Sequence, residues 1–334
     1  MIAVENSTWN NIGDAFYQQS IMMCLQQSLP DAKIVSFDGP FRRAFRPRGF
    51  AKNGYDARFA TQADHYVFSG PILGEGFFEE YGPLIEHIVA KGASYSLQSI
   101  HAYAEDALLE RMRAFFKTYP PLAFQTRDTF TFNKFKGLDV PMYDGICFAF
   151  FVSKLPNIPT VKPEKPFVAV SFHASPDPDI QLSNNNELPL TKRVTVGPQN
   201  KSNWRIRRQF DFRRSYPTTL GEFDIVRPVH SFYPSPHLLF ARPSSFITYN
   251  PLNFIAIYAN CAAVITDRVH AGVAALSHGK PAYVTSLDTR YAIFEHAPVT
   301  RSGDFLELDK EMLDTRFSEI KLWLAQAYQS LLVR

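Results

Sequence analysis

The residues best suited to chemistry lie in one short stretch around Arg268 and His270. Residues 262–265 form an apolar run that is too short for a helix, which predicts a buried strand. Asp267, Arg268 and His270 follow this run directly. Apolar residues then recur at helical spacing as far as Gly279, a residue type that is common just after a helix. The stretch therefore predicts a strand, a charged turn and a helix, with the ionisable side chains at the carboxyl end of the strand.

This arrangement suits the binding of an anion. The first turn of a helix presents free N–H groups, and the guanidinium of Arg268 matches a carboxylate or a phosphate. The imidazole of His270 is of a type that titrates near neutral pH. A purely structural interpretation is also open, in which Asp267 caps the helix, Arg268 pairs with it and His270 is a hydrogen-bonded core residue. Because open parallel sheets bind ligands at this edge, the anion site is the favoured interpretation.

Two further basic residues occupy comparable positions in the first half of the chain. Residues 94–100 predict a strand, and His101 lies where that strand should end. A second apolar run, 122–125, is followed by Arg127, an acid and a new helix, which repeats the pattern around Arg268. We therefore expect His101 and Arg127 to face the same cleft. The other positions that we expect to line this cleft are Asn11, Gly13, Asp14, Gly70 and Asp267.

Two of these positions have a structural alternative. Residues 11–14, Asn-Ile-Gly-Asp, open the first predicted helix, and a plain capping turn in which Asp14 accepts N–H groups fits them as well. Gly70 lies in a loop whose glycines permit either a sharp turn or a close approach to a ligand. That loop has neither the spacing of a dinucleotide fingerprint nor that of a Walker loop.

Two segments are rich in basic residues. Residues 41–48 interleave arginine with phenylalanine, which fits a solvated loop, a phosphate-rich acceptor or an anchor on an anionic membrane face. Residues 201–214 hold six basic residues and one acid, which fits a solvated helix face or a second anion patch. Because the net charge is only +3 over 334 residues, we expect no nucleic-acid binding.

The composition is typical of a globular protein with more than one domain. Hydrophobic residues make up 46% of the 334 residues, which is ample for two cores. The three cysteines are far apart in apolar contexts and predict neither a disulfide framework nor a metal site. The sequence shows no signal peptide and no membrane-length apolar run, so we expect a cytoplasmic protein. A peripheral contact with the inner membrane face stays open.

A proline-rich linker divides the chain. Residues 154–166 hold four prolines without periodicity, and strands alternate with helices on either side of them. We predict an N-terminal α/β domain over 1–153 and a C-terminal α/β domain over 167–334 that closes with a helix over 310–333. Residues 146–152 are predicted to form the last strand of the first domain. Two Rossmann-like α/β domains facing a cleft constitute a glycosyltransferase-B-like architecture.

Several short motifs occur in a fixed order along the chain. They are Asn-Ile-Gly-Asp at 11–14, Thr-Arg-Asp at 126–128, Asp-Gly at 144–145, Ile-Thr-Asp-Arg-Val-His-Ala at 265–271 and Gly-Lys-Pro at 279–281. In these motifs the chain resembles the polysaccharide pyruvyl transferase family over nearly its whole length, and the motif at 265–271 is the most specific. The chain departs from the family at 69–71, where it has Ser-Gly-Pro in place of a run of glycines.

The resemblance implies transfer of the pyruvyl group of phosphoenolpyruvate onto two hydroxyls of a sugar, with formation of a cyclic ketal and release of phosphate. The acceptor would be a polysaccharide, such as an exopolysaccharide, or its lipid-linked oligosaccharide precursor. Arg127 and Arg268 would bind the donor, assisted by Val269 and His270. His270 would be the catalytic acid or base, and His101 is a second candidate. The resemblance places the donor on the second domain and the acceptor on the first, and it requires no metal and no cofactor.

Two other functions remain open. A sugar-nucleotide-dependent glycosyltransferase on the same fold would use Arg268 and the helix terminus to bind a diphosphate. A non-catalytic relative would bind a glycan or a protein partner, although it would have no physical need to retain Arg127, Arg268 and His270 together.

Overall fold

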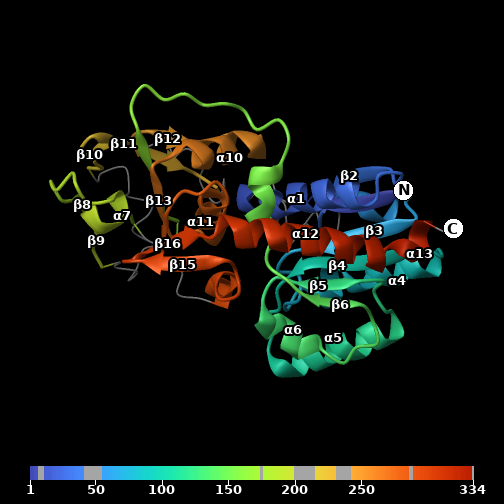
Figure 1. Cartoon of the computed structure of the whole chain (residues 1–334). Helices are drawn as coiled ribbons and strands as arrows, with labels where there is room; N and C mark the ends of the chain where they lie inside the picture. Colours follow the sequence, from blue (N-terminus) through green and yellow to red (C-terminus); the bar gives the residue numbers. More distant parts are fainter. Residues whose placement is uncertain are drawn as a thin grey trace.

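The chain forms two α/β lobes, each built on its own sheet, in a computed structural model (Figure 1). The structure describes residues 1–6, 11–40, 55–173, 176–198, 215–230, 242–285 and 289–332. The basic segments 41–48 and 201–214 lie outside the described residues, so the interpretations of both stay predictions.

The first lobe is a six-stranded sheet in the order β2-β1-β3-β4-β5-β6, and every neighbouring pair is parallel. Its strands are β1 (Ile2–Asn6), β2 (Ile34–Asp38), β3 (His65–Ser69), β4 (Ser94–Ile100), β5 (Phe124–Thr126) and β6 (Met142–Asp144). Because successive side chains of a strand point to opposite faces, Val67 and Phe68 of β3 enter different cores. All residues of β3 are buried, since both faces of the sheet are covered.

Helices cover the two faces of this sheet. One face packs on α1 (Ile12–Ser28), and the other face packs on helices of the first lobe alone. Those are α3 (Phe77–Glu80), α4 (Gly82–Ala90), α5 (Asp106–Thr118) and α6 (Thr129–Phe135), with the short 3₁₀ turn η2 (Ala57–Phe59) beside α4. Parallel strands joined by helices leave all carboxyl ends at one edge of the sheet, which lies toward the second lobe.

The second lobe has a sheet in the order β10-β11-β7-β13-β14-β16-β15, with β12 paired to β11. Its strands are β7 (Phe167–Ser171), β10 (Thr219–Leu220), β11 (Phe223–Pro228), β12 (Ser245–Phe246), β13 (Ala263–Thr266), β14 (Ala282–Val284), β15 (Val299–Ser302) and β16 (Phe305–Leu308). Strands β11, β7, β13 and β14 are parallel and carry α10 (Pro251–Asn260) and α11 (Val269–Ser277). A small sheet of β8 (Ile180–Leu182) and β9 (Val194–Val196) lies beside it with α7 (Leu190–Arg193).

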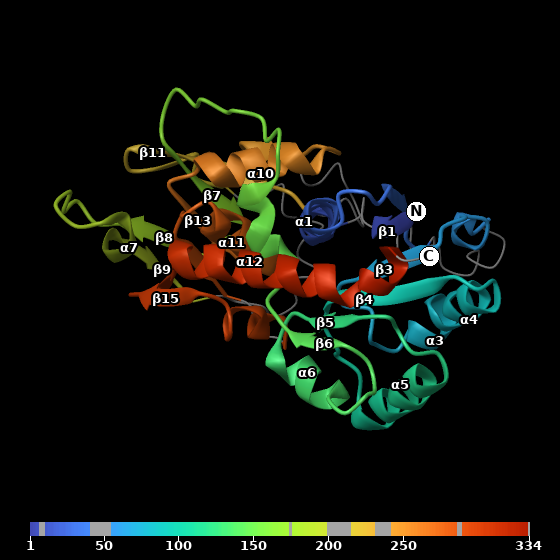
Figure 2. The same cartoon turned by 45° about the vertical axis from the view of Figure 1, so that its right-hand side comes forward.

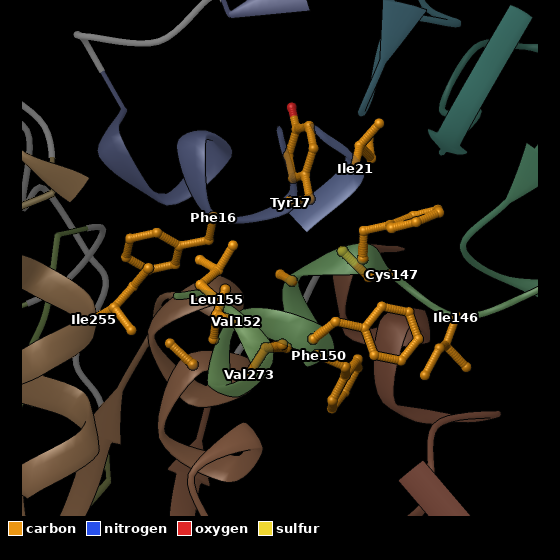
Figure 3. Close-up of a cluster of buried hydrophobic side chains, with 14 of the residues drawn as sticks. Phe16, Tyr17, Ile21, Ile146, Cys147, Phe150, Val152, Leu155, Ile255 and Val273 are labelled. Carbon is orange, nitrogen blue, oxygen red and sulfur yellow. The ribbon is translucent and has the colours of Figure 1, made fainter. Parts of the chain in front are cut away.

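A shared hydrophobic core joins the two lobes (Figure 3). Phe16 of α1, Phe150 and Val273 of α11 belong to this one cluster. Phe150 lies in η3 (Phe148–Lys154), a 3₁₀ segment that packs between α1 and α11. The predicted strand over 146–152 is therefore wrong, because a short apolar run does not distinguish a strand from a segment that is buried on all sides.

The C-terminal helix spans both lobes. It consists of α12 (Lys310–Ala327), which starts at the second sheet and runs back across α1, and the short α13 (Gln329–Leu332), as Figures 1 and 2 show. Between them, the Tyr328 hydroxyl contacts Ser96 and Gln98 of β4, so the helix ends on the first sheet. A further 3₁₀ segment, η5 (Thr289–Phe294), lies beside α11. None of the described helices combines the length and the apolar content needed to cross a bilayer.

Candidate active site

The turn between β13 and α11 is held in place by Thr266. Its hydroxyl donates to the carbonyl of Ser171 at 2.7 Å and accepts the backbone N–H of Arg268 at 2.9 Å. Arg268 occupies the N-cap position of α11 in an extended conformation, and Val269 is the first helical residue. The guanidinium of Arg268 is therefore presented at the helix N-terminus, where the helix dipole also favours an anion.

Asp267 does not cap this helix, in contrast to the structural interpretation of the motif. Its carboxylate accepts the backbone N–H of His173 at 2.9 Å and 3.0 Å, and it thereby fixes the loop that follows β7. The N-cap of α11 is Arg268 instead. Asp267 therefore supports the site through its contact with the loop after β7.

His270 lies at the junction of the two lobes and is buried. Its Nδ1 is 3.6 Å from Oδ1 of Asp14 in the first turn of α1, and its Nε2 is 3.9 Å from Sγ of Cys147. The ring of Tyr17 packs edge-on at a centroid distance of 5.4 Å. Residues of the early motif and of the late motif therefore meet here, although 256 positions separate Asp14 from His270.

Positive charges from both lobes surround His270. Burial lowers the pKa of this histidine well below its usual value, and the nearby charges of Arg127, Arg290 and Arg268 lower it further. Both effects favour the neutral form of the ring, whereas the residue type alone suggested titration near neutral pH. A site that concentrates basic groups in this way is suited to a ligand with more than one negative charge.

Close backbone packing brings α1 onto the second lobe. The N–H of Ile12 donates to the carbonyl of His230 at 2.9 Å, next to Asn11 at the N-cap of α1. A Cβ on Gly13 would lie 3.1 Å from Cβ of His270 and 3.2 Å from Nδ1 of His230. A side chain at this position would require the neighbouring histidines to shift by a few tenths of an ångström.

His230 is a component that sequence analysis missed. It lies two residues after the end of β11, and its Nε2 contacts the hydroxyl of Tyr258. Burial lowers the pKa of His230 well below its usual value, and the charge of Arg268 lowers it further. The rule that singled out His101, a histidine at the end of a predicted strand, would also have found His230.

Arg127 and His101 are brought together by Asp128, as the carboxyl ends of β4 and β5 adjoin. Arg127 is buried, and its Nε has no hydrogen-bond partner among the described residues, although Asp128 Oδ2 lies 4.0 Å away. A buried guanidinium with an unused donor is costly unless a ligand supplies the acceptor. Arg127 thus adds a buried guanidinium of the first lobe to the charges near His270.

His101 and Asp128 form a buried pair. The carboxylate oxygen Oδ2 of Asp128 lies 2.8 Å from Nδ1 of His101, and Oδ1 accepts the N–H of Thr131 at 2.7 Å as the cap of α6. Burial alone would raise the pKa of Asp128, but the hydrogen bonds from His101 and Thr131 outweigh it, and the pKa lies below its usual value. Because a carboxylate only accepts, Nδ1 of His101 is the donor in this pair, and Nε2 lies 3.5 Å from the hydroxyl of Thr289 of the second lobe.

Gly70 has a packing role in the first lobe. Its φ of +86° is in the region that favours glycine, and a Cβ there would lie 2.1 Å from the hydroxyl oxygen of Tyr17. Since the ring of Tyr17 packs edge-on against His270, Gly70 supports the position of both rings. A direct contact between Gly70 and a ligand stays a prediction.

A second group of basic residues lines a narrow cavity of about 20 Å³ at the carboxyl ends of β7, β11 and β13. The charged and titratable residues of its wall are His173, Arg227, His230, Arg242 and Arg268. Arg227 and Arg242 both pair with Asp177, at 2.8 Å and 3.2 Å, so one carboxylate balances two guanidinium groups. Arg268 and His230 are shared between this cavity and the surroundings of His270.

Comparisons with known proteins agree with the motifs and the fold. A family model described as polysaccharide pyruvyl transferase matches residues 11–289. Among solved structures, S. aureus MnaA in complex with UDP aligns with a TM-score of 0.51 at 10% identity, over 98% of this chain and 90% of that one. A candidate UDP-N-acetylglucosamine 2-epimerase from Listeria monocytogenes aligns with a TM-score of 0.50 at 10% identity, over the same shares. No curated protein matches the chain. The predicted two-domain α/β, glycosyltransferase-B-like fold is confirmed.

Proposed function

This chain belongs to the polysaccharide pyruvyl transferase family, and from that premise we propose that it moves the pyruvyl group of phosphoenolpyruvate onto a sugar. The acceptor is a polysaccharide or its lipid-linked precursor, and the products are a cyclic ketal and inorganic phosphate. The reaction needs no cofactor besides the donor. We further propose that it takes place in the cytoplasm, with a peripheral contact at the membrane that carries a lipid-linked acceptor.

The observation that carries this proposal is the set of basic residues around His270. Phosphoenolpyruvate carries a phosphate and a carboxylate on the same carbon, C2, so it requires two fixed cationic anchors. Arg268, at the N-terminus of α11, suits one of these groups, and Arg127, with its unused Nε, suits the other. The two arginines come from different lobes, so the donor would bridge the junction.

Two histidines are placed to move the protons. We assign His270 as the acid that protonates C3 of the donor, because the negative charge of a bound donor counteracts the cations that lower its pKa. We assign His101 as the base, because Nδ1 donates to Asp128 and Nε2, which now faces the Thr289 hydroxyl, is the nitrogen that would take the proton of an acceptor hydroxyl.

The chemistry balances with these two groups. The first acceptor hydroxyl attacks C2 and gives its proton to His101, while His270 gives a proton to C3. The bond between C2 and the phosphate oxygen then breaks, and the phosphate leaves with the electron pair. The second hydroxyl adds to C2, and its proton leaves with the phosphate. The proton on His101 restores His270 for the next turnover.

A second candidate is a sugar-nucleotide-dependent transferase. The feature that favours it is the cavity with Arg227, Arg242 and Arg268, since a diphosphate also needs clustered guanidinium groups. The likeness to MnaA with UDP is a likeness of fold at 10% identity and supports no ligand by itself. A glycan-binding relative without activity is the third candidate.

Calorimetric titration distinguishes these candidates. We expect phosphoenolpyruvate to bind saturably and UDP not to compete. Arg268→Ala should weaken donor binding about 10- to 100-fold, the value of a lost charge-assisted hydrogen-bonded contact. Arg316→Ala is the matched control, because Arg316 is an exposed arginine on α12 that pairs with Glu319 and is not among the cations that act on His270. Binding of UDP without phosphoenolpyruvate would favour the nucleotide-dependent transferase.

A further inference from the structure

Tyr103 presents an exposed aromatic ring at the carboxyl edge of the first sheet. It is 54% exposed, although it lies two residues after the buried His101. The two rings are close to parallel, at an interplanar angle of 23° and a centroid distance of 6.4 Å. An aromatic side chain in this place is thus accessible from solvent and adjacent to the proposed base.

The backbone of Tyr103 is firmly held. Its N–H donates to the carbonyl of Leu73 at 3.1 Å, and Leu73 pairs with Ala102 in an isolated parallel bridge. The loops after β3 and β4 are therefore joined at this point. Such a connection extends the sheet edge and fixes the direction in which the aromatic side chain leaves it.

Gly74 provides the seat for this ring. A Cβ on Gly74 would lie 2.0 Å from Cζ of Tyr103 and 2.3 Å from its hydroxyl oxygen, so the phenol end of the ring rests directly on the Gly74 backbone. The φ angle of Gly74 is not positive, in contrast to that of Gly70, so its backbone conformation does not require glycine. Space for the Tyr103 ring is what the glycine supplies.

We propose that Tyr103 is the platform on which the acceptor sugar ring stacks. One face of a pyranose carries C–H groups, which pack on the electron-rich face of an aromatic ring, while the hydroxyls remain at the rim. A sugar on Tyr103 would direct its rim toward His101, where an acceptor hydroxyl would replace the 3.5 Å contact between Nε2 and Thr289. This inference rests on the pyruvyl transfer proposed above and names the acceptor subsite of that reaction.

The test uses saturation-transfer NMR with methyl glycosides of galactose, mannose, glucose and N-acetylglucosamine as probes. We expect at least one probe to receive saturation from the wild-type protein, chiefly at the protons of one ring face. Tyr103→Ala should reduce affinity about tenfold, the value of one lost aromatic face, and Tyr103→Phe should retain it. Tyr249→Ala is the control, because Tyr249 is 70% exposed but lies on the second lobe.

Gly74→Ala supplies an independent test, because it moves the ring without removing it. We expect the same loss as for Tyr103→Ala, and no additional loss in the double variant, since both changes act through one ring. Circular dichroism of each variant verifies the fold.

The possible outcomes distinguish a failure of the sugar platform at Tyr103 from a failure of the proposed pyruvyl transfer. No saturation of any probe by the wild-type protein, or saturation that survives Tyr103→Ala, would overturn the platform whether or not phosphoenolpyruvate binds. Tyr103-dependent sugar binding in a protein that does not bind phosphoenolpyruvate would support the platform and refute the pyruvyl transfer.

Discussion

Replacement of Asp128 by Asn should disable the proposed base and leave the fold around it intact. The two carboxylate oxygens have different partners. Oδ1 accepts the N–H of Thr131 at the start of α6, and Oδ2 faces Nδ1 of His101. In the Asn variant the amide oxygen must remain on the Thr131 N–H, because that donor has to be satisfied. The amide NH₂ then faces Nδ1 and donates to it, which moves the histidine proton to Nε2.

The size of the effect follows from this reversal. With a proton on Nε2, His101 cannot accept one from an acceptor hydroxyl, and a lost general base lowers turnover typically about 10²- to 10⁴-fold. The free energy of unfolding should change by less than about 1 kcal/mol. That is roughly the value of the helix cap, which the Asn variant retains. Donor affinity should stay within about twofold, since Arg127 and Arg268 are unchanged and twofold is about 0.4 kcal/mol.

The assay is phosphate release under saturating phosphoenolpyruvate and acceptor, with thermal unfolding and donor calorimetry on the same samples. Asp144→Asn is the matched control, because Asp144 at the end of β6 is exposed and accepts only the Thr129 hydroxyl, at 2.7 Å, among the described contacts. Turnover of Asp128→Asn within a few-fold of wild type would refute the assignment of His101 as the base.

Three other expectations concern packing and pH. Gly13→Ala should lower turnover about tenfold or more, because its Cβ would displace His270. Its melting temperature should stay near that of the wild type, because a gain in helix propensity of about 1 kcal/mol offsets the overpacking. Phe150→Ala should cost about 3–5 kcal/mol in urea unfolding and shift a single transition, because its core joins both lobes; two transitions with one unshifted would contradict this. Burial lowers the pKa of His65 to about 3, so only the unfolded chain takes up this proton below about pH 6.5, and stability should fall as the pH drops from there. From pH 7.5 to 5.5 the loss is about 1.4 kcal/mol for this residue, and it should be missing from the pH dependence of unfolding in His65→Asn.

Local features were predictable from the sequence. The strand over 94–100 and the helix that follows Asp128 occur where the apolar pattern placed them. Gly279 has the positive φ, +71°, of a residue that ends a helix. These features depend on interactions within a few residues of one another, which is why the pattern of residue types suffices to predict them.

The convergence of Arg127, Arg268 and His270 was also predictable, because parallel sheets collect the carboxyl ends of their strands at one edge. The contacts across the junction were not. His230 and Arg290 act on His270 through the way the lobes pack, and no spacing in the sequence encodes that arrangement. The same holds for the shared core, in which a segment predicted as a strand became η3 because it is enclosed by both lobes.

The most direct test of pyruvyl transfer is a proton and phosphorus NMR measurement in D₂O on protein, phosphoenolpyruvate and a panel of glycan acceptors. We expect the phosphorus signal of the donor to convert to that of inorganic phosphate only with an acceptor. We also expect a new ketal methyl signal with one deuterium, because the exchangeable position of His270 delivers a deuteron to C3. Unchanged phosphoenolpyruvate with every acceptor, or release of free pyruvate without a ketal, would contradict pyruvyl transfer.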